Sequence, residues 1–110
     1  MDYLLGMARP FTHPAQSDIS LDYVLHALSD PVRREIVQKL MASDRMSCAR
    51  ACAQHPPSTV SFHHKILREA GLIRSEKIGV EVINTLRRGD IDERFPGLLD
   101  AVFPAKPSLP

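Results

Sequence analysis

The stretch STVSFHHKILREAGLI, from Ser58 to Ile73, decides how the fold of this 110-residue chain can be predicted. At about 100° per residue, a helix that begins at Ser58 gathers its apolar residues on one arc and leaves a mixed face opposite. Gly71 is well placed just after the end of this helix, because glycine accepts the left-handed backbone that ends many helices. The stretch therefore predicts an amphipathic helix to about Ala70. Its apolar arc holds Val60, His63, Ile66, Leu67 and Ala70.

The opposite face of this helix has the chemistry that a helix in the DNA major groove needs. Serine hydroxyls donate or accept hydrogen bonds at several base edges, and Lys or Arg reaches phosphate or guanine. Phe62 would either contact a thymine methyl group or be an ordinary exposed apolar side chain. The face holds Ser58, Ser61, Phe62 and Lys65, with Arg68 at its margin.

Two adjacent histidines lie in the same helix. His63 falls in the apolar arc, where we expect a buried, hydrogen-bonded side chain, whereas His64 falls on the flank at about 240°. Neighbouring residues of a helix point about 100° apart, so the pair cannot easily share one metal ion. A metal site at these two residues is not expected.

The segments before this helix also read as helical. Ser20 is a candidate N-cap for a helix over residues 20–28, and Asp30 and Pro31 fit the N-cap and first position of the next helix. An apolar stripe runs along this second helix: Val32, Ile36, Val37 and Leu40. We expect its cationic residues to point toward water: Arg33, Arg34 and Lys39. Ser47 is expected to cap a short Ala-rich helix, which the prolines after His55 end.

After Gly71 the hydrophobic period changes to two. Two strands, Leu72–Ile78 and Val80–Leu86, are expected to form a hairpin that turns near Gly79. Residues 90–103 then read as a broken amphipathic helix interrupted at Pro96. The order is helix, helix, short helix, helix, strand, strand, helix. The expected class is mainly α with a β-hairpin wing (α+β), a winged helix-turn-helix.

Composition fits one small domain, with 44% hydrophobic and 25% charged residues. We expect a loosely ordered arm over residues 1–17, the domain over 18–103 and a tail over 104–110. The net charge is −3 over residues 1–30, +5 over 31–90 and −1 over 91–110. A basic middle suits a polyanion partner, although a solvated charged face would look the same. No membrane-spanning or signal segment is seen, so a cytoplasmic protein is expected.

Two stretches carry a resemblance to a known family. ALSDPVRREIVQKL, residues 27–40, resembles the opening pattern a-L-a-D-P-x-R-x-x-I-L-x-x-L of the ArsR/SmtB family of winged-helix repressors. STVSFHHKILREAGLI resembles that family's recognition helix, S-x-x-S-x-H-L-x-x-L-x-x-A-G-L-V. The resemblance covers about Leu21 to Leu86, and the two pieces at this separation make it specific.

The resemblance implies a homodimer that binds a palindromic double-stranded DNA operator and represses transcription until an inducer releases it. It places in the groove Ser58, Thr59, Ser61, Phe62 and Lys65. It brings Lys77 and Arg74 of the wing to the DNA backbone. Pro57 stands where many relatives have a polar residue, usually Gln, so one possible contact is missing here.

The first and last helices are the usual dimer surface of this family, and both are apolar here. A large exposed apolar patch marks an interaction site. Alternatively, these side chains cover only the domain's own core. The residues concerned are Leu21, Tyr23, Leu25, Ile91, Phe95, Leu98, Leu99, Val102 and Phe103.

The cysteines bear on the inducer. Many metal-sensing relatives carry Cys-x-Cys in the third helix, whereas this chain has only Cys48 and Cys52, with His55 beyond them. Two thiolates one helical turn apart could ligate a soft metal with His55, which would make a metal- or thiol-responsive repressor. The favoured interpretation is that both are buried structural cysteines. No metal site or cofactor is therefore expected, and the inducer stays unidentified.

Two other classes of protein were weighed. A winged-helix protein-interaction module that lacks DNA binding would share the fold, although the basic middle favours DNA. An enzyme is not expected, because the sequence offers no nucleophile with a base at a plausible spacing, no phosphate loop and no paired carboxylates.

Overall fold

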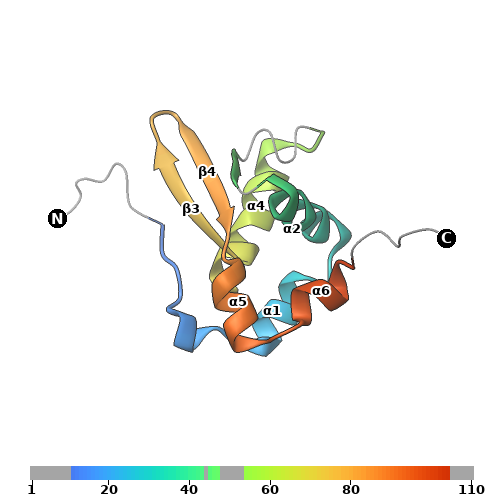
Figure 1. Ribbon diagram of the computed structural model, residues 1–110. Coiled ribbons are helices and arrows are strands. Elements are labelled where there is room, and N and C mark those ends of the chain that lie inside the picture. Colours follow the sequence, from blue (N-terminus) through green and yellow to red (C-terminus); the bar gives the residue numbers. More distant parts are fainter. Residues whose placement is uncertain (1–10, 44, 48–53, 105–110) are drawn as a thin grey trace.

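The computed structural model describes residues 11–43, 45–47 and 54–104, and the structural statements below concern these residues. In Figure 1 the β3–β4 hairpin projects from a group of helices, and α1, α5 and α6 gather at the end away from the hairpin's tip. The elements are, in chain order, η1 (Gln16–Asp18), α1 (Leu21–Ala27), α2 (Pro31–Ser43), β2 (Arg45–Ser47), α4 (Pro57–Glu69), β3 (Ile73–Ile78), β4 (Glu81–Leu86), α5 (Arg88–Arg94) and α6 (Leu98–Val102). The predicted mainly α class with a hairpin wing is confirmed. Within the described ranges, no helix is both long and apolar enough to span a membrane.

The sheet has three antiparallel strands in the order β2-β4-β3. The predicted hairpin is present, with Ser75 opposite Asn84 and Ile78 opposite Glu81. Its turn contains Gly79, whose φ of 64° is left-handed. The short strand β2 was not predicted, and Ser47 lies in it rather than capping a helix. The rest of the expected Ala-rich helix, residues 48–53, lies outside the described residues.

The core draws on every described helix of the domain and on β3. Its fully buried side chains are apolar, as the stripes of the sequence predict. They include Ile19, Val24, Ile36, Val37, Leu40, Leu67, Leu72, Ile73, Ile91 and Leu99. α4 lies in the middle of this arrangement, because it contacts α1, α2 and β3.

The helix boundaries confirm two of the predicted capping residues, Ser20 and Asp30. The Ser20 hydroxyl accepts a hydrogen bond from the Tyr23 amide at 3.4 Å. Asp30 Oδ2 accepts hydrogen bonds from the amides of Val32 and Arg33, at 2.9 and 3.1 Å. Such caps satisfy amides that have no partner inside the helix.

Gly71 ends α4 with a φ of 87°, as predicted. The Ile19 side chain packs directly on it, since a Cβ at Gly71 would lie 2.6 Å from Ile19 Cγ1. Glycine is therefore required there for its backbone and for the space that it leaves.

The end of the domain is a helix broken at Pro96, as predicted. α5 ends at Arg94, and Gly97 with a φ of 85° precedes α6. Arg88 joins the two helices by donating to Asp92 at 3.0 Å and to Asp100 at 2.7 Å.

Residues 11–17 contact the domain at several points. The Ser75 amide donates to His13 Nε2 at 2.9 Å, and Arg87 Nη1 donates to the Pro14 carbonyl at 2.9 Å. Arg94 Nη1 donates to the Gln16 carbonyl at 2.7 Å. The domain boundary at residue 18 stays a prediction, but the segment before it is tied to β3 and α5.

Candidate nucleic-acid interface

α4 presents the outer face that the sequence predicts. Ser58, Ser61, Phe62 and Lys65 are exposed, and Thr59 is half-buried. Phe62 has 57% of its surface exposed, which is high for so large an apolar side chain. The opposite side of the helix is buried through Val60, His63 and Leu67. The helix thus exposes a polar and aromatic face, while its opposite face is packed against the rest of the domain.

Arg33 is buried, so the prediction that it points toward water is wrong. Only 6% of its surface is exposed. Its guanidinium donates to the Ala27 carbonyl at 2.8 Å and to the His26 carbonyl at 3.2 Å. These are carbonyls at the C-terminal end of α1, which lack partners within the helix. Arg33 therefore fastens the end of α1 to the start of α2.

The same guanidinium reaches α4. Arg33 Nη1 donates to Nδ1 of His63 at 3.2 Å, and Asp30 Oδ2 lies 3.9 Å from that nitrogen. Burial lowers the pKa of His63, the Asp30 carboxylate raises it, and the positive charge of Arg33 lowers it. His63 is thus the buried, hydrogen-bonded residue that the sequence predicts, and it anchors α4 to α2.

His64 was expected on the flank of α4, but it is only 1% exposed. Its Nδ1 donates to the Val60 carbonyl at 2.8 Å, because a carbonyl can only accept. Burial is the main cause that lowers the pKa of His64. α4 is contacted by three elements, so its buried side is wider than one apolar arc.

Arg68, expected at the margin of the DNA-binding face, is held against its own domain. Its Nη1 donates to the Ser75 hydroxyl at 3.0 Å, and that hydroxyl donates to Asn84 Oδ1 at 2.6 Å. The Phe11 ring stacks on the guanidinium at 4.4 Å. The local sequence gave no signal of these contacts, because Phe11 is remote in the chain and Ser75 belongs to the following strand.

The wing exposes both cations that the resemblance brings to the DNA backbone. Arg74 and Lys77 are exposed on β3, next to the exposed acids Glu76 and Glu81. The hairpin tip is apolar, since Ile78 is 46% and Val80 94% exposed. The wing is therefore mixed in charge rather than basic.

The metal candidates gain no support from the described residues. Cys48 and Cys52 lie outside them. The Nε2 atoms of His55 and His64 are buried and have no hydrogen-bond partner among the residues that the structure describes. Among the residues that the structure describes, no group of three or more His, Cys, Asp or Glu side chains could hold a metal ion.

The residues expected at a dimer surface fall into three groups. Leu21, Tyr23 and Leu25 of α1 are exposed, at 44%, 64% and 47%. Leu99 and Ile91 are fully buried within their own chain. The remaining four are half-buried and pack against the chain's own core: Phe95, Leu98, Val102 and Phe103. The last segment therefore covers its own core and still leaves part of its apolar surface free.

Comparison with known proteins agrees with this geometry. Residues 28–76 match a family model described as a helix-turn-helix domain. The range contains α2 and α4, and with them the contact between Arg33 and His63. No curated protein sequence matches the chain.

Solved structures extend the likeness beyond residues 28–76. The chain is similar to an ArsR family transcriptional regulator with a TM-score of 0.63 and 19% identity, covering 74% of this chain and 90% of that one. It is also similar to HlyU from Vibrio cholerae N16961, with a TM-score of 0.61 and 23% identity, covering 74% of this chain and 89% of HlyU. The similarity to NolR from Sinorhizobium fredii has a TM-score of 0.62 and 18% identity, and it covers 90% of this chain and 100% of NolR. This is a winged helix-turn-helix protein.

As a winged helix-turn-helix protein, the chain has the fold that its two motifs predict. The resemblance to ArsR/SmtB regulators is confirmed at the level of fold by these neighbours. The domain match and the neighbours together show a helix-turn-helix fold.

Proposed function

We propose that this protein is a sequence-specific regulator of transcription, a homodimeric repressor that inserts α4 into the major groove and is released by an inducer. The observation that carries the proposal is the outer face of α4. Ser58, Ser61 and Phe62 stand exposed on a helix whose back is bonded to α2 through Arg33 and His63. A reading helix must be held rigidly while its contact face stays open.

Lys65 forms an ion pair with Glu69 that a DNA phosphate can replace. Its Nζ lies 3.5 Å from Glu69 Oε2, and the two side chains are 64% and 58% exposed. Exposed ion pairs of this kind contribute little to stability. A phosphate can therefore replace Glu69 at small cost, whereas Arg68 would have to leave Ser75 and Phe11.

Two apolar side chains of α1 support the homodimer. Leu21 and Leu25 lie within about 40° of each other around the helix, so they form one exposed strip. An isologous contact would pair this strip with the same strip of a second copy. Half-exposed apolar side chains of α6, such as Val102, could extend such a surface.

The test is selection from a randomised duplex pool at two salt concentrations, followed by sequencing of the retained DNA. We expect an enriched inverted repeat whose affinity falls steeply as salt rises, because phosphate contacts release counterions. An absence of retention at low salt would overturn the proposal and favour the protein-interaction module.

A pair of lysine variants makes the test specific to α4. On the selected site, Lys65→Ala should reduce the salt slope by about 0.9, the value for one lost phosphate contact. Lys39→Ala is the matched control, because Lys39 pairs with Glu35 at 3.2 Å with the same spacing on α2. Equal losses from both variants would show a plain effect of net charge and contradict the placement of α4.

A further inference from the structure

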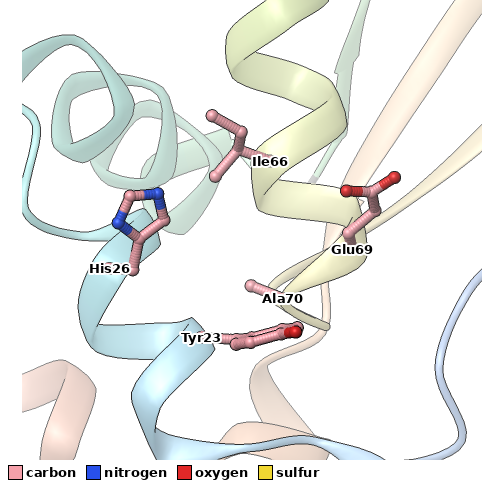
Figure 2. A pocket seen from close by; sticks show the side chains of 5 residues that line it. All are labelled: Tyr23, His26, Ile66, Glu69 and Ala70. Carbon is pink, nitrogen blue, oxygen red and sulfur yellow. The ribbon is translucent and has the colours of Figure 1, made fainter.

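A cavity of about 240 Å³ lies between α1 and α4 (Figure 2). α1 contributes Tyr23 and His26, and α4 contributes Ile66, Glu69 and Ala70. Ala70 is buried and Ile66 half-buried, so they form an apolar floor, while the other three side chains are exposed around it. This site belongs neither to the groove-facing side of α4 nor to the Leu21–Leu25 strip.

Tyr23 is separated from that strip by the geometry of α1. At about 100° per residue it lies about 160° from Leu25 and 200° from Leu21 around the helix. A partner that covers the two leucines therefore leaves Tyr23 on the opposite flank, where it faces α4. The proposed dimer does not account for a tyrosine that is 64% exposed.

The polar groups around the cavity have hydrogen-bonding capacity to spare. In the described part of the chain, neither the Tyr23 hydroxyl nor the His26 ring makes a hydrogen bond. Within the described ranges, the one ion pair of the Glu69 carboxylate is with the Lys65 ammonium at 3.5 Å. A phenol, an imidazole and a carboxylate around an apolar floor are the mixture of groups found in small-molecule sites.

The charge of the lining selects the class of ligand. Among the five described lining residues, Glu69 carries a formal negative charge and none is Lys or Arg. The face of a tyrosine ring also attracts cations. We propose that this cavity binds a small organic cation, with its ammonium at Glu69 and its apolar body between Tyr23, Ile66 and Ala70. A volume below that of drug-sized pockets limits the body to about one ring.

Binding there would act on α4. The ligand would release Lys65 from Glu69, which alone favours a phosphate contact, and would bridge α4 to α1, so an inducer role requires that the bridged position of α4 disfavours DNA by more than this gain. Its role as the inducer rests on the proposed function, whereas binding itself does not. A ligand changes DNA affinity only as far as it prefers one state of the protein over the other.

The chain provides its own reporter for the test. It has no tryptophan and two tyrosines, so Tyr3→Phe leaves Tyr23 as the single source of tyrosine fluorescence. This variant is titrated with three probes of matched shape: benzylammonium, benzyl alcohol and benzoate. We expect a saturable change with benzylammonium, about fivefold tighter binding than for benzyl alcohol, and no saturation with benzoate.

Two glutamate variants decide the role of the carboxylate. Glu69→Gln should bind benzylammonium and benzyl alcohol equally, while Glu35→Gln, from the similar Glu35–Lys39 pair on α2, should keep the fivefold preference. Both side chains are on helix surfaces, so both variants should fold. An absence of saturation with benzylammonium, or a preference for it that survives in Glu69→Gln, would overturn the site.

The inducer role is read separately from the site. Benzylammonium should lower retention of the selected DNA by the unmodified chain and leave retention by Glu69→Gln unchanged. Selective binding with unchanged retention would overturn the inducer role alone. If the chain retains no DNA, the proposed function fails, and the fluorescence titration still decides the site.

Discussion

Arg33 and His63, thirty positions apart, are joined by a hydrogen bond of 3.2 Å from Nη1 to Nδ1. A guanidinium can only donate, so Nδ1 accepts and the neutral imidazole carries its proton on Nε2. Arg33 belongs to the D-P-x-R motif and His63 to the S-x-H motif. The two motifs that define the sequence resemblance are therefore two halves of one contact, which sets how α4 lies on α2.

Arg33→Ala should destabilise the protein strongly. It removes the buried donor to the Ala27 carbonyl and to the His63 ring, and each such loss costs about 1–3 kcal/mol, whereas the His26 carbonyl keeps the Ser29 amide and hydroxyl as donors. We expect a loss of about 3–4 kcal/mol in the free energy of unfolding, measured with urea. Arg34→Ala is the control: Arg34 is half-buried and donates to the Leu28 carbonyl alone at 2.8 Å, so about 1 kcal/mol is expected. Equal losses would contradict the role given to Arg33.

Stability should fall in mild acid because of the histidines of α4. Burial is the first cause that lowers the pKa of both His63 and His64 below the ordinary 6.5. The folded protein thus favours the neutral rings, and the unfolded chain binds more protons below pH 6.5. The contribution of each neutral ring to the free energy of unfolding is complete above about pH 6.5. It is lost as the pH falls toward the lowered pKa of that ring in the folded protein.

Urea titrations at about pH 7.5 and 5.5 test this prediction. His63→Gln and His64→Gln should each show a smaller acid loss than the unmodified protein, and the double variant a smaller one still. Some loss should remain, because burial and the nearby cations Arg74, Arg87 and Arg68 also lower the pKa of His13. The prediction fails if the double variant loses as much stability in acid as the parent.

Gly71→Ala should cost far more than Gly79→Ala. Both residues have a left-handed backbone, with φ of 87° and 64°, which costs a non-glycine residue about 1–2 kcal/mol. At Gly71 the new Cβ would also lie 2.6 Å from Ile19 Cγ1, whereas nothing lies within 4 Å at Gly79. Urea unfolding should therefore show that Gly79→Ala loses only the backbone cost of about 1–2 kcal/mol in the free energy of unfolding. Gly71→Ala should lose about 1–3 kcal/mol more than Gly79→Ala. Similar losses would mean that Ile19 moves aside freely.

Substitutions on α1 should separate dimerisation from the cavity. The double variant Leu21→Ser/Leu25→Ser removes the exposed apolar strip, so light scattering at micromolar concentration should show the mass of a monomer. Tyr23→Ser, on the opposite flank, should leave the mass of a dimer unchanged. A dimer in the leucine variant would contradict the proposed surface, as would a monomer in the tyrosine variant.

The sequence was sufficient for α1, α2, α4, the β3–β4 hairpin and the broken last helix, because its signals there are local. The caps at Ser20 and Asp30, the glycine after α4 and the break at Pro96 each depend on residues within one turn. The change of period after Gly71 likewise located the hairpin. β2 was missed because a three-residue strand exists only through its pairing with β4.

The side chains that were misplaced are those whose partners lie far away. Arg33 was assigned to water because of its charge, although about 100° per residue places it between Ile36 and Val37 on the apolar stripe. The free carbonyls that it satisfies belong to another helix. Arg68 was assigned to the groove because Phe11 and Ser75 could not be foreseen beside it. Helical position predicts direction, but the partners of a long cationic side chain come from tertiary structure.

The hydrogen bond from the Ser75 amide to His13 has a consequence for solubility. β3 is one of the two outer strands of the sheet, and outer strands with free amides invite pairing with another chain. His13 accepts a hydrogen bond from one of these amides, that of Ser75. Pro14 beside it has no N–H that could bond to an incoming strand. Residues 11–14 thus cover part of the β3 edge and oppose its pairing with a strand of another molecule. A chain shortened to begin after Pro14 would expose that edge, and precipitation would be the first change to look for.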